Sequence, residues 1–333
     1  MLASFLRISR VDPHGAWDAW SIWNLRARYL AGGQATWRYA VSKYIILQHP
    51  DYPLLTSSLT AHAWVNSRSI GARVPIAVAL AFMLATVLVL VAGVVRSRGA
   101  MPGLCAGAML LAAPEWFKLG AAQYADIPLG FYFLATLALL CAGRHDGRFA
   151  LLAGFTASLS AWTKDEGLMF TGACLVVTLV LCGAKRAAMV MAGALPVVLF
   201  LAWFKLRMAP GLDPMWRQGA AVMLAKLSTG GRYATIATQF AKHASAIREL
   251  ALLPLFGLAL GFKLNRATMG CFVVVGLMLV GFFGVYLVSP YPLEWHLESS
   301  LDRLYIQLLP AFLFGWFRAG TMRRYGTSDT IRS

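Results

Sequence analysis

Residues 74–95 read VPIAVALAFMLATVLVLVAGVV, an uncharged run that stops at the basic residues Arg96 and Arg98. An apolar run of about 20 residues is long enough for an α-helix to cross the hydrocarbon core of a bilayer. Further apolar runs bounded by charge lie at residues 100–114, 127–142, 149–162, 168–183, 187–205, 250–262, 267–289 and 304–318. The sequence therefore predicts an all-α polytopic membrane protein with about nine transmembrane helices.

The composition agrees with this class. Of the 333 residues, 59% are hydrophobic and 13% are charged, about half the charged fraction of a soluble domain. A disordered chain and a disulfide scaffold are excluded, because charge is low and the five cysteines have no CxxC spacing. The net charge of +16 comes from basic residues that flank the apolar runs, so it indicates contact with anionic lipid and not with nucleic acid.

The basic connections between the runs predict the orientation of the chain. Short basic segments recur at every second connection, at residues 96–98, 144–148, 185–186, 263–266 and 318–324. The positive-inside rule places these segments in the cytoplasm. Twelve of the fourteen acidic residues then fall on the opposite face, which indicates a working surface there.

We expect a single domain, residues 1–333, made of three parts. An outer first loop with interfacial helices covers residues 1–73, the transmembrane bundle covers 74–318, and a cytoplasmic tail covers 319–333. A large exported first loop normally follows a helix that carries it across the membrane. We therefore expect a first helix that this sequence lacks, upstream of residue 1.

The outer first loop holds two polar motifs. In residues 15–23, GAWDAWSIW, a Trp recurs every three residues. This spacing predicts an interfacial helix that holds Asp18 at the membrane boundary. The alternative is an anchor helix in which Asp18 only complements the helix dipole.

In the second motif, residues 49–53, HPDYP, two prolines force an extended turn. His49 and Asp51 are candidates to assist a reaction or bind a metal, and the alternative is a purely structural turn.

The other outer connections are equally polar. Asp126 lies at a helix entrance in residues 124–128, YADIP, where it either caps the helix or serves a function that justifies an acid at membrane depth. In the tight turn 163–167, TKDEG, Lys164 is a candidate contact for a lipid-linked phosphate and Glu166 for its orientation; the alternative is a solvated reverse turn.

The last outer loop, residues 289–303, reads SPYPLEWHLESSLDR and leads into the final apolar run. Arg303 can make a bidentate contact with phosphate, and Glu294 or His296 can hydrogen-bond sugar hydroxyls. The alternative is an ordinary solvated helix start, in which Arg303 partly offsets the like charges of Glu298 and Asp302.

The order of these motifs resembles the GT-C glycosyltransferases, the multi-span enzymes that include protein mannosyltransferases and lipid A aminoarabinose transferases, and more narrowly bacterial members with family 39 or family 83-like architecture. The resemblance covers most of the chain and rests on residues 15–20, 49–53, 124–128 and 164–167. It implies that Asp18 is the catalytic base or the acid that orients the acceptor, and that Asp126 is a second catalytic acid. It also implies that Lys164 and Arg303 bind phosphate. The chain departs from the family in lacking the first span and in being short.

The implied reaction moves a sugar from a polyprenyl-phosphate donor to a hydroxyl of a glycan, lipid or protein acceptor. It would invert the anomeric configuration and take place on the periplasmic face of the bacterial inner membrane, in glycosylation of the cell envelope. The sequence contains no nucleotide-binding motif. The resemblance to the family allows a divalent metal cofactor, although the sequence offers no compact set of metal ligands. The alternatives are a flippase or transporter of a lipid-linked saccharide, and a non-catalytic assembly protein or defective fragment. The lack of internal repeats and of mid-span ionisable residues favours the enzyme.

Overall fold

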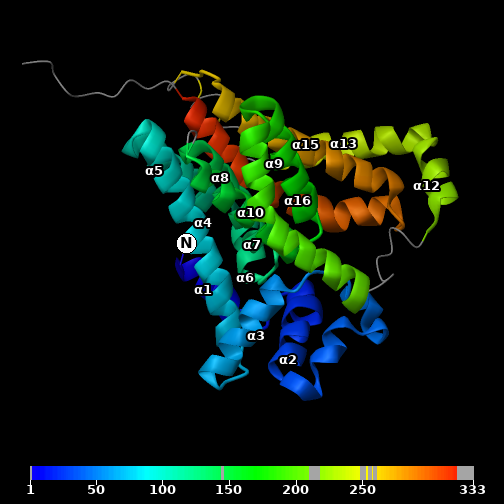
Figure 1. Cartoon of the computed structure of the whole chain (residues 1–333). Helices are drawn as coiled ribbons and strands as arrows, with labels where there is room; N and C mark the ends of the chain where they lie inside the picture. Colours follow the sequence, from blue (N-terminus) through cyan, green and yellow to red (C-terminus); the bar gives the residue numbers. More distant parts are fainter. Residues whose placement is uncertain are drawn as a thin grey trace, which may run out of the picture.

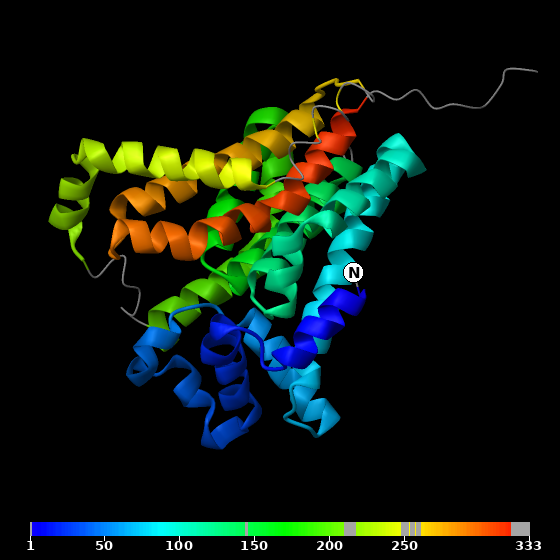
Figure 2. The same ribbon diagram turned by 180° about the vertical axis from the view of Figure 1, so that it is seen from behind.

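The computed structural model describes residues 2–143, 146–209, 218–247 and 261–320, together with residues 253 and 257. Within these ranges the chain forms helices and no strand (Figures 1 and 2), apart from one isolated backbone bridge between Phe262 and Gly320. The all-α prediction is confirmed.

The first loop is a compact group of short helices at one end of the bundle, drawn in blue in Figure 1. It consists of α1 (Leu2–Val11), η1 (Ala19–Trp23), α2 (Asn24–Ala31), the turns η2 (Gly33–Ala35), η3 (Trp37–Val41) and η4 (Lys43–Gln48), and α3 (Leu55–Ser67). The helix predicted around Asp18 is present as η1 and α2, and its position at the membrane interface stays a prediction. The prolines of residues 50–53 separate η4 from α3, as expected for residues that cannot continue a helix.

Helices cover eight of the nine predicted spans. The elements are α4 (Arg73–Arg98), α5 (Ala100–Ala112), α6 (Pro114–Ala121), α7 (Asp126–Ala142), α8 (Gly147–Thr163), α9 (Glu166–Cys182), α10 (Ala184–Trp203) with its continuation η5 (Phe204–Met208), α12 (Ala220–Leu227), α13 (Gly230–Ala246), α15 (Arg266–Val288) and α16 (Leu293–Ala319). The run 250–262 and the tail after residue 320 fall almost wholly outside the described residues.

Length and composition identify the helices that could cross a membrane on their own. Among the described residues, α4, α15 and the combined helix Ala184–Met208 are long and apolar enough to cross a membrane. Helices α6 and α7 pass this test only as a pair, bent by 118°. The bend places the start of α7, and therefore Asp126, inside the bundle.

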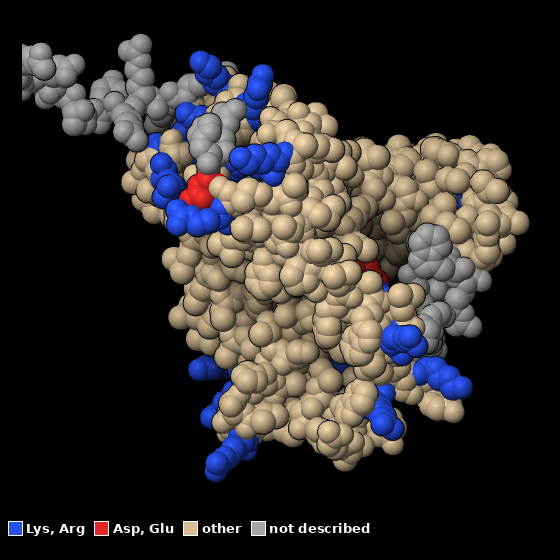
Figure 3. Space-filling view, in the orientation of Figure 1, with Lys and Arg blue, Asp and Glu red and all other residues tan. Residues whose placement is uncertain are grey.

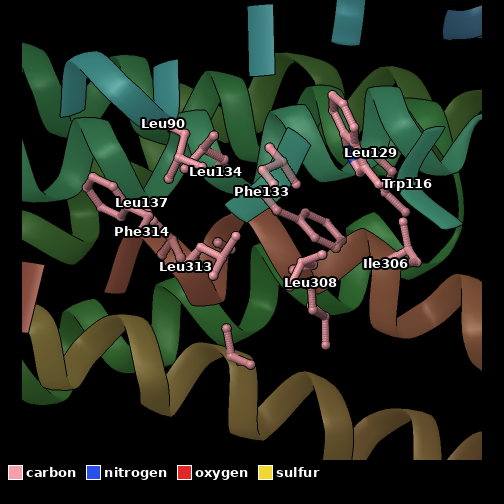
Figure 4. Packing of buried hydrophobic residues seen from close by; sticks show 14 of the residues in the cluster. Leu90, Trp116, Leu129, Phe133, Leu134, Leu137, Ile306, Leu308, Leu313 and Phe314 are labelled. Atoms are coloured by element: carbon pink, nitrogen blue, oxygen red, sulfur yellow. The ribbon is translucent and has the colours of Figure 1, made fainter. Parts of the chain in front are cut away.

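The core lies where α7 packs against α16, α4 and α9 (Figure 4). The rings of Phe133 and Phe170 stack with their centroids 4.1 Å apart. A Cβ on Gly130 would lie 3.0 Å from the backbone oxygen of Gln307, so α7 and α16 are in close contact there. Small residues at such contacts are what brings helices together in a bilayer, where burial of apolar surface gives little driving force.

Candidate functional site

The centre of the site is Asp126, whose side chain is fully buried at the start of α7. Its Oδ1 accepts hydrogen bonds from Gln307 Nε2 at 2.5 Å and from Lys164 Nζ at 3.3 Å. Its Oδ2 accepts from Arg303 Nη2 at 2.9 Å and Nε at 3.3 Å. A buried carboxylate is costly unless it is paired and hydrogen-bonded, and here two cations and an amide satisfy both oxygens.

Arg303 joins Asp126 to Asp18 of the first loop. Its Nη2 lies 2.7 Å from Asp18 Oδ2, and its guanidinium carbon lies 4.5 Å from the ring centroid of Tyr124. The side chains of Arg303 and Asp18 keep 20% and 17% of their surface exposed, so this pair forms the accessible edge of the network. Three predicted residues from distant parts of the chain therefore meet in one chain of ion pairs.

Asp18 is held in place by backbone contacts between the first loop and the bend before α7. Gly15 has a φ of +74°, and a Cβ at this position would lie 2.5 Å from the carbonyl oxygen of Ala122. Gln123 Nε2 donates to the carbonyl of Pro13 at 3.1 Å. Only glycine fits this close approach without strain, so the sequence positions Asp18 over the bend between α6 and α7.

Lys164 connects the network to Glu166 in the turn between α8 and α9. Its Nζ lies 2.8 Å from Glu166 Oε1, and its side chain is 6% exposed. Burial lowers the pKa of Lys164, but the charges of Asp126 and Glu166 outweigh it and raise that pKa above its usual value. Lys164 is therefore a buried, permanently charged link between two carboxylates.

A second cluster lies beside the first. Lys205 Nζ lies 2.8 Å from Asp165 Oδ1 and 4.0 Å from Asp51 Oδ2, and His49 Nδ1 lies 3.9 Å from Asp51 Oδ1. The His49 ring stacks on Tyr52, with centroids 4.5 Å apart. The predicted residues His49 and Asp51 thus sit next to the site, and Asp51 is almost fully buried.

Burial and neighbouring carboxylates set the protonation of this second cluster. Burial, followed by the charges of Asp51 and Glu166, raises the pKa of Asp165 to about 6, against the pull of Lys205. Burial lowers the pKa of His49, and it raises the pKa of Tyr52 well above its usual value together with the nearby acids. At pH 7 His49 is therefore neutral, and the Tyr52 phenol remains a hydrogen-bond donor.

Arg26 organises the HPDYP turn and is a residue that sequence reasoning missed. It is fully buried on α2, and its guanidinium donates to the carbonyls of Ala40 at 2.9 Å, His49 and Pro50 at 3.3 Å, and Tyr52 at 2.7 Å. Its acceptors are backbone carbonyls, which every residue carries, so the sequence does not show which residues bind Arg26. Gln307 and Lys205 were also missed, although each is a polar residue in an apolar run and so needed a partner.

Two predicted residues do not join the network. His296 Nδ1 shares a hydrogen bond with Ser289 Oγ at 2.7 Å, and burial lowers the pKa of His296 to about 4. Glu294 is exposed in the first turn of α16. The predicted loop 290–303 is largely helical, because α16 already begins at Leu293.

A hollow opens on one face of the protein. Figure 3 shows this hollow beside the arm formed by α12 and α13, with an acidic side chain at its floor. Among the described residues, His, Cys, Asp and Glu side chains form no group of three or more that could hold a metal ion. At the accessible edge of the network, the available chemistry is that of a partly exposed carboxylate, Asp18, beside Arg303.

Fold and site together define a multi-pass helical membrane protein with an ion-pair network at one end of its bundle. Two solved structures share the fold, both of ArnT from Cupriavidus metallidurans. The structure bound to undecaprenyl phosphate aligns with a TM-score of 0.54 at 17% identity, and the apo structure with 0.51 at 16%. Each alignment covers 96% of this chain and 59% of the ArnT chain, so the chain spans about three fifths of ArnT's length. No protein-family model and no curated protein matches the sequence.

Proposed function

We propose that this protein is a membrane glycosyltransferase that moves a sugar from a polyprenyl-phosphate donor to an acceptor hydroxyl. The observation that carries the proposal is the ion-pair chain Asp18, Arg303, Asp126 and Lys164. It is supported by the resemblance of the motif order to GT-C enzymes and by the fold shared with ArnT, one structure of which is bound to undecaprenyl phosphate. We further propose that the site faces the periplasm and the C-terminus the cytoplasm.

Arg303 is the residue best placed to contact the donor phosphate. Its ion pairs use Nε and Nη2, and among the residues that the structure describes its Nη1 has no acceptor. A guanidinium suits phosphate because it donates in a planar fork. Lys164 is more deeply buried and already holds two carboxylates, so it acts on the phosphate through its charge.

Phosphate binding and activation of Asp18 are coupled in this proposal. A donor phosphate that contacts Nη1 and Nη2 of Arg303 together competes with Asp18, which is paired with Nη2. Asp18, released from its ion pair, accepts the proton of the acceptor hydroxyl. The acceptor oxygen then forms a bond to the anomeric carbon, the bond from that carbon to the phosphate oxygen breaks, and polyprenyl phosphate leaves with the electron pair. A single displacement of this kind inverts the anomeric configuration.

Asp126 has a positioning role in this mechanism. Its side chain is fully buried and both of its oxygens are occupied, so it fixes Arg303 and Lys164 and does not touch substrate. Glu166 and His49 are partly exposed and are our candidates for sugar contacts. Asp51 positions His49, whose Nδ1 lies 3.9 Å from Asp51 Oδ1. Contacts of Glu294 and His296 with the sugar remain predictions.

The test is transfer of radiolabelled sugar from a panel of polyprenyl-phosphate donors in membranes that contain wild type or Asp18→Asn. We expect transfer with wild type and none with Asp18→Asn. The matched control is Asp12→Asn, an exposed acid in the same loop, which should transfer at the wild-type rate. No sugar transfer in any of the three, with the lipid-linked sugar crossing the bilayer intact, would instead identify a flippase or transporter.

A further inference from the structure

A cavity bordered by charged residues lies at the end of the bundle opposite the candidate site. Helices α8 and α10 begin at this end and α9 ends at it, whereas the other ends of α8 and α9 meet at Lys164 and Glu166. The cavity is open, has a volume of about 630 Å³, and is bordered by the cations Lys185, Arg186 and Arg266 and by Asp146. Nothing in the proposed mechanism uses these residues.

Two cations of this cavity, Lys185 and Arg266, are not neutralised by its acid. Asp146 caps α8 and lies 3.0 Å from Arg148 Nη2, so its charge is already paired. Among the described residues, neither Lys185 nor Arg266 forms an ion pair. Figure 3 shows basic side chains gathered around a single acidic one at this end of the protein. The cavity therefore has a surplus of positive charge that favours an anion.

The cavity continues inward as a narrow apolar slot between α7, α9 and α15. The two spaces share Leu181, Cys182, Arg186 and Arg266. The slot is lined mainly by apolar side chains and thiols, among them Leu137, Cys141, Cys174, Val177, Cys271 and Val274. Its free volume of about 50 Å³ admits a few methylene-sized groups. A ligand that fills both spaces must carry an anionic group and an apolar chain.

We propose that this cavity binds a phosphate-bearing lipid from the leaflet opposite the candidate site. Its phosphate lies among Lys185, Arg186 and Arg266, and the beginning of an acyl chain enters the slot beside Cys182. Basic pockets between transmembrane helices at headgroup level are suited to anionic lipid headgroups. A small soluble phosphate compound would leave the apolar slot unused, which is why the occupant is a lipid.

The first test uses Cys182, which is exposed and borders both the cavity and the slot. The unmodified chain is placed in nanodiscs of phosphatidylcholine with or without phosphatidylglycerol, and the rate of alkylation by a water-soluble maleimide is followed by peptide mass spectrometry. We expect phosphatidylglycerol to slow alkylation of Cys182 severalfold. Alkylation of Cys105, a half-buried thiol near the same end on α5 that lines neither space, should be unchanged.

Two results would overturn the lipid site. One is an equal rate for Cys182 with and without phosphatidylglycerol. The other is equal protection by glycerol phosphate in phosphatidylcholine nanodiscs, which would indicate a soluble phosphate ligand. A Cys182→Ser variant identifies the signal that belongs to this thiol.

The second test removes the charge. Lys185→Gln/Arg266→Gln should weaken retention of phosphatidylglycerol in native mass spectrometry by about fivefold for each cation, and so by about twenty-fivefold for the pair. The matched control Arg96→Gln/Lys263→Gln removes two exposed cations from the same end, neither of which lines the cavity, and should retain the lipid. An equal loss in both variants would mean that the lipid is held by general surface charge, and the proposed site would be rejected.

Discussion

Asp126 shows how a single carboxylate determines the arrangement of the site. It is fully buried, yet it holds an arginine from α16 and a lysine from the turn between α8 and α9. Removing one partner of a buried ion pair leaves the others charged and uncompensated, which costs more than the pair contributes. Arg303 and Lys164 each keep one other carboxylate, Asp18 and Glu166, but among the described residues only Asp126 joins the two cations to each other.

Asp126→Asn keeps the shape of the side chain and removes its charge. We expect a loss of about 3–5 kcal/mol in the free energy of unfolding, measured by denaturation in mild detergent. Asp12→Asn, an exposed acid, should change it by less than about 0.5 kcal/mol. An Asp126→Asn protein as stable as that control would show that the network is not structural.

Asp165 gives the site a defined pH dependence. Its pKa in the folded protein, about 6, lies above its ordinary value of 3.8. A folded-state pKa above the unfolded one means that the folded protein holds this proton more tightly. The stability that this bound proton adds to the folded protein is fully present below about pH 4 and is lost as the pH rises to about 6.

Asp165→Asn removes this dependence, because the amide does not ionise. We expect the unfolding temperature of Asp165→Asn, relative to wild type, to rise as the pH increases from about 4 to about 6 and then to level off. Thermal unfolding across this pH range measures the difference between the two proteins. Parallel curves for the two proteins would contradict the raised pKa.

At the scale of elements, the first loop is held together by Arg26 of α2, which binds backbone carbonyls of the HPDYP turn and of η3. Hydrogen bonds from a charged donor contribute about 1.5–3 kcal/mol each. The turn carries His49, Asp51 and Tyr52 to the site. Its geometry is therefore set by one side chain in a neighbouring helix.

Arg26→Gln shortens this side chain and removes most of its donors. We expect amide hydrogen exchange in residues 49–53 to become at least about tenfold faster, in line with a loss of about 1.4 kcal/mol or more. Arg28→Gln, an exposed arginine on the same helix, is the matched control and should leave this exchange unchanged. The same exchange rate in both variants would mean that the turn is held by its prolines alone.

The helices could be predicted from the sequence because apolar runs and flanking charges are local signals. The run 267–289 corresponds to α15 (Arg266–Val288), and 127–142 to α7 (Asp126–Ala142). The bend of 118° between α6 and α7 could not be predicted, since it depends on packing around Ala122 and Gln123. The depth of Asp126 in the bundle follows from that bend.

The site was predicted as a set of residues but not as a network. The sequence points to Asp126, Lys164, Glu166 and Arg303 through local charge near the ends of spans and to Asp18 through the Trp-rich motif of the first loop, and the structure brings them together. Their pairing joins residues as far apart as Asp18 and Arg303, which no local pattern records. Arg26 bonds to backbone carbonyls, so neither its role nor its partners could be read from residue types.

At the scale of the whole molecule, the two ends of the bundle differ in charge. Around the candidate site, Asp18, Asp51, Asp126, Asp165 and Glu166 face Arg26, Lys164, Lys205 and Arg303, five acids against four cations. The opposite end carries a surplus of cations around its cavity. A phosphate that takes both Nη1 and Nη2 of Arg303 would displace a carboxylate from Nη2, and the more exposed of the two carboxylates there is Asp18.

The most direct test measures donor binding and sugar transfer together for wild type and Asp18→Asn in the same membranes. The coupled mechanism predicts that Asp18→Asn abolishes transfer while it binds polyprenyl phosphate at least as tightly as wild type, because Arg303 loses a competing carboxylate. A folded Asp18→Asn protein that transfers sugar at the wild-type rate would contradict the assignment of Asp18 and, with it, the proposed reaction.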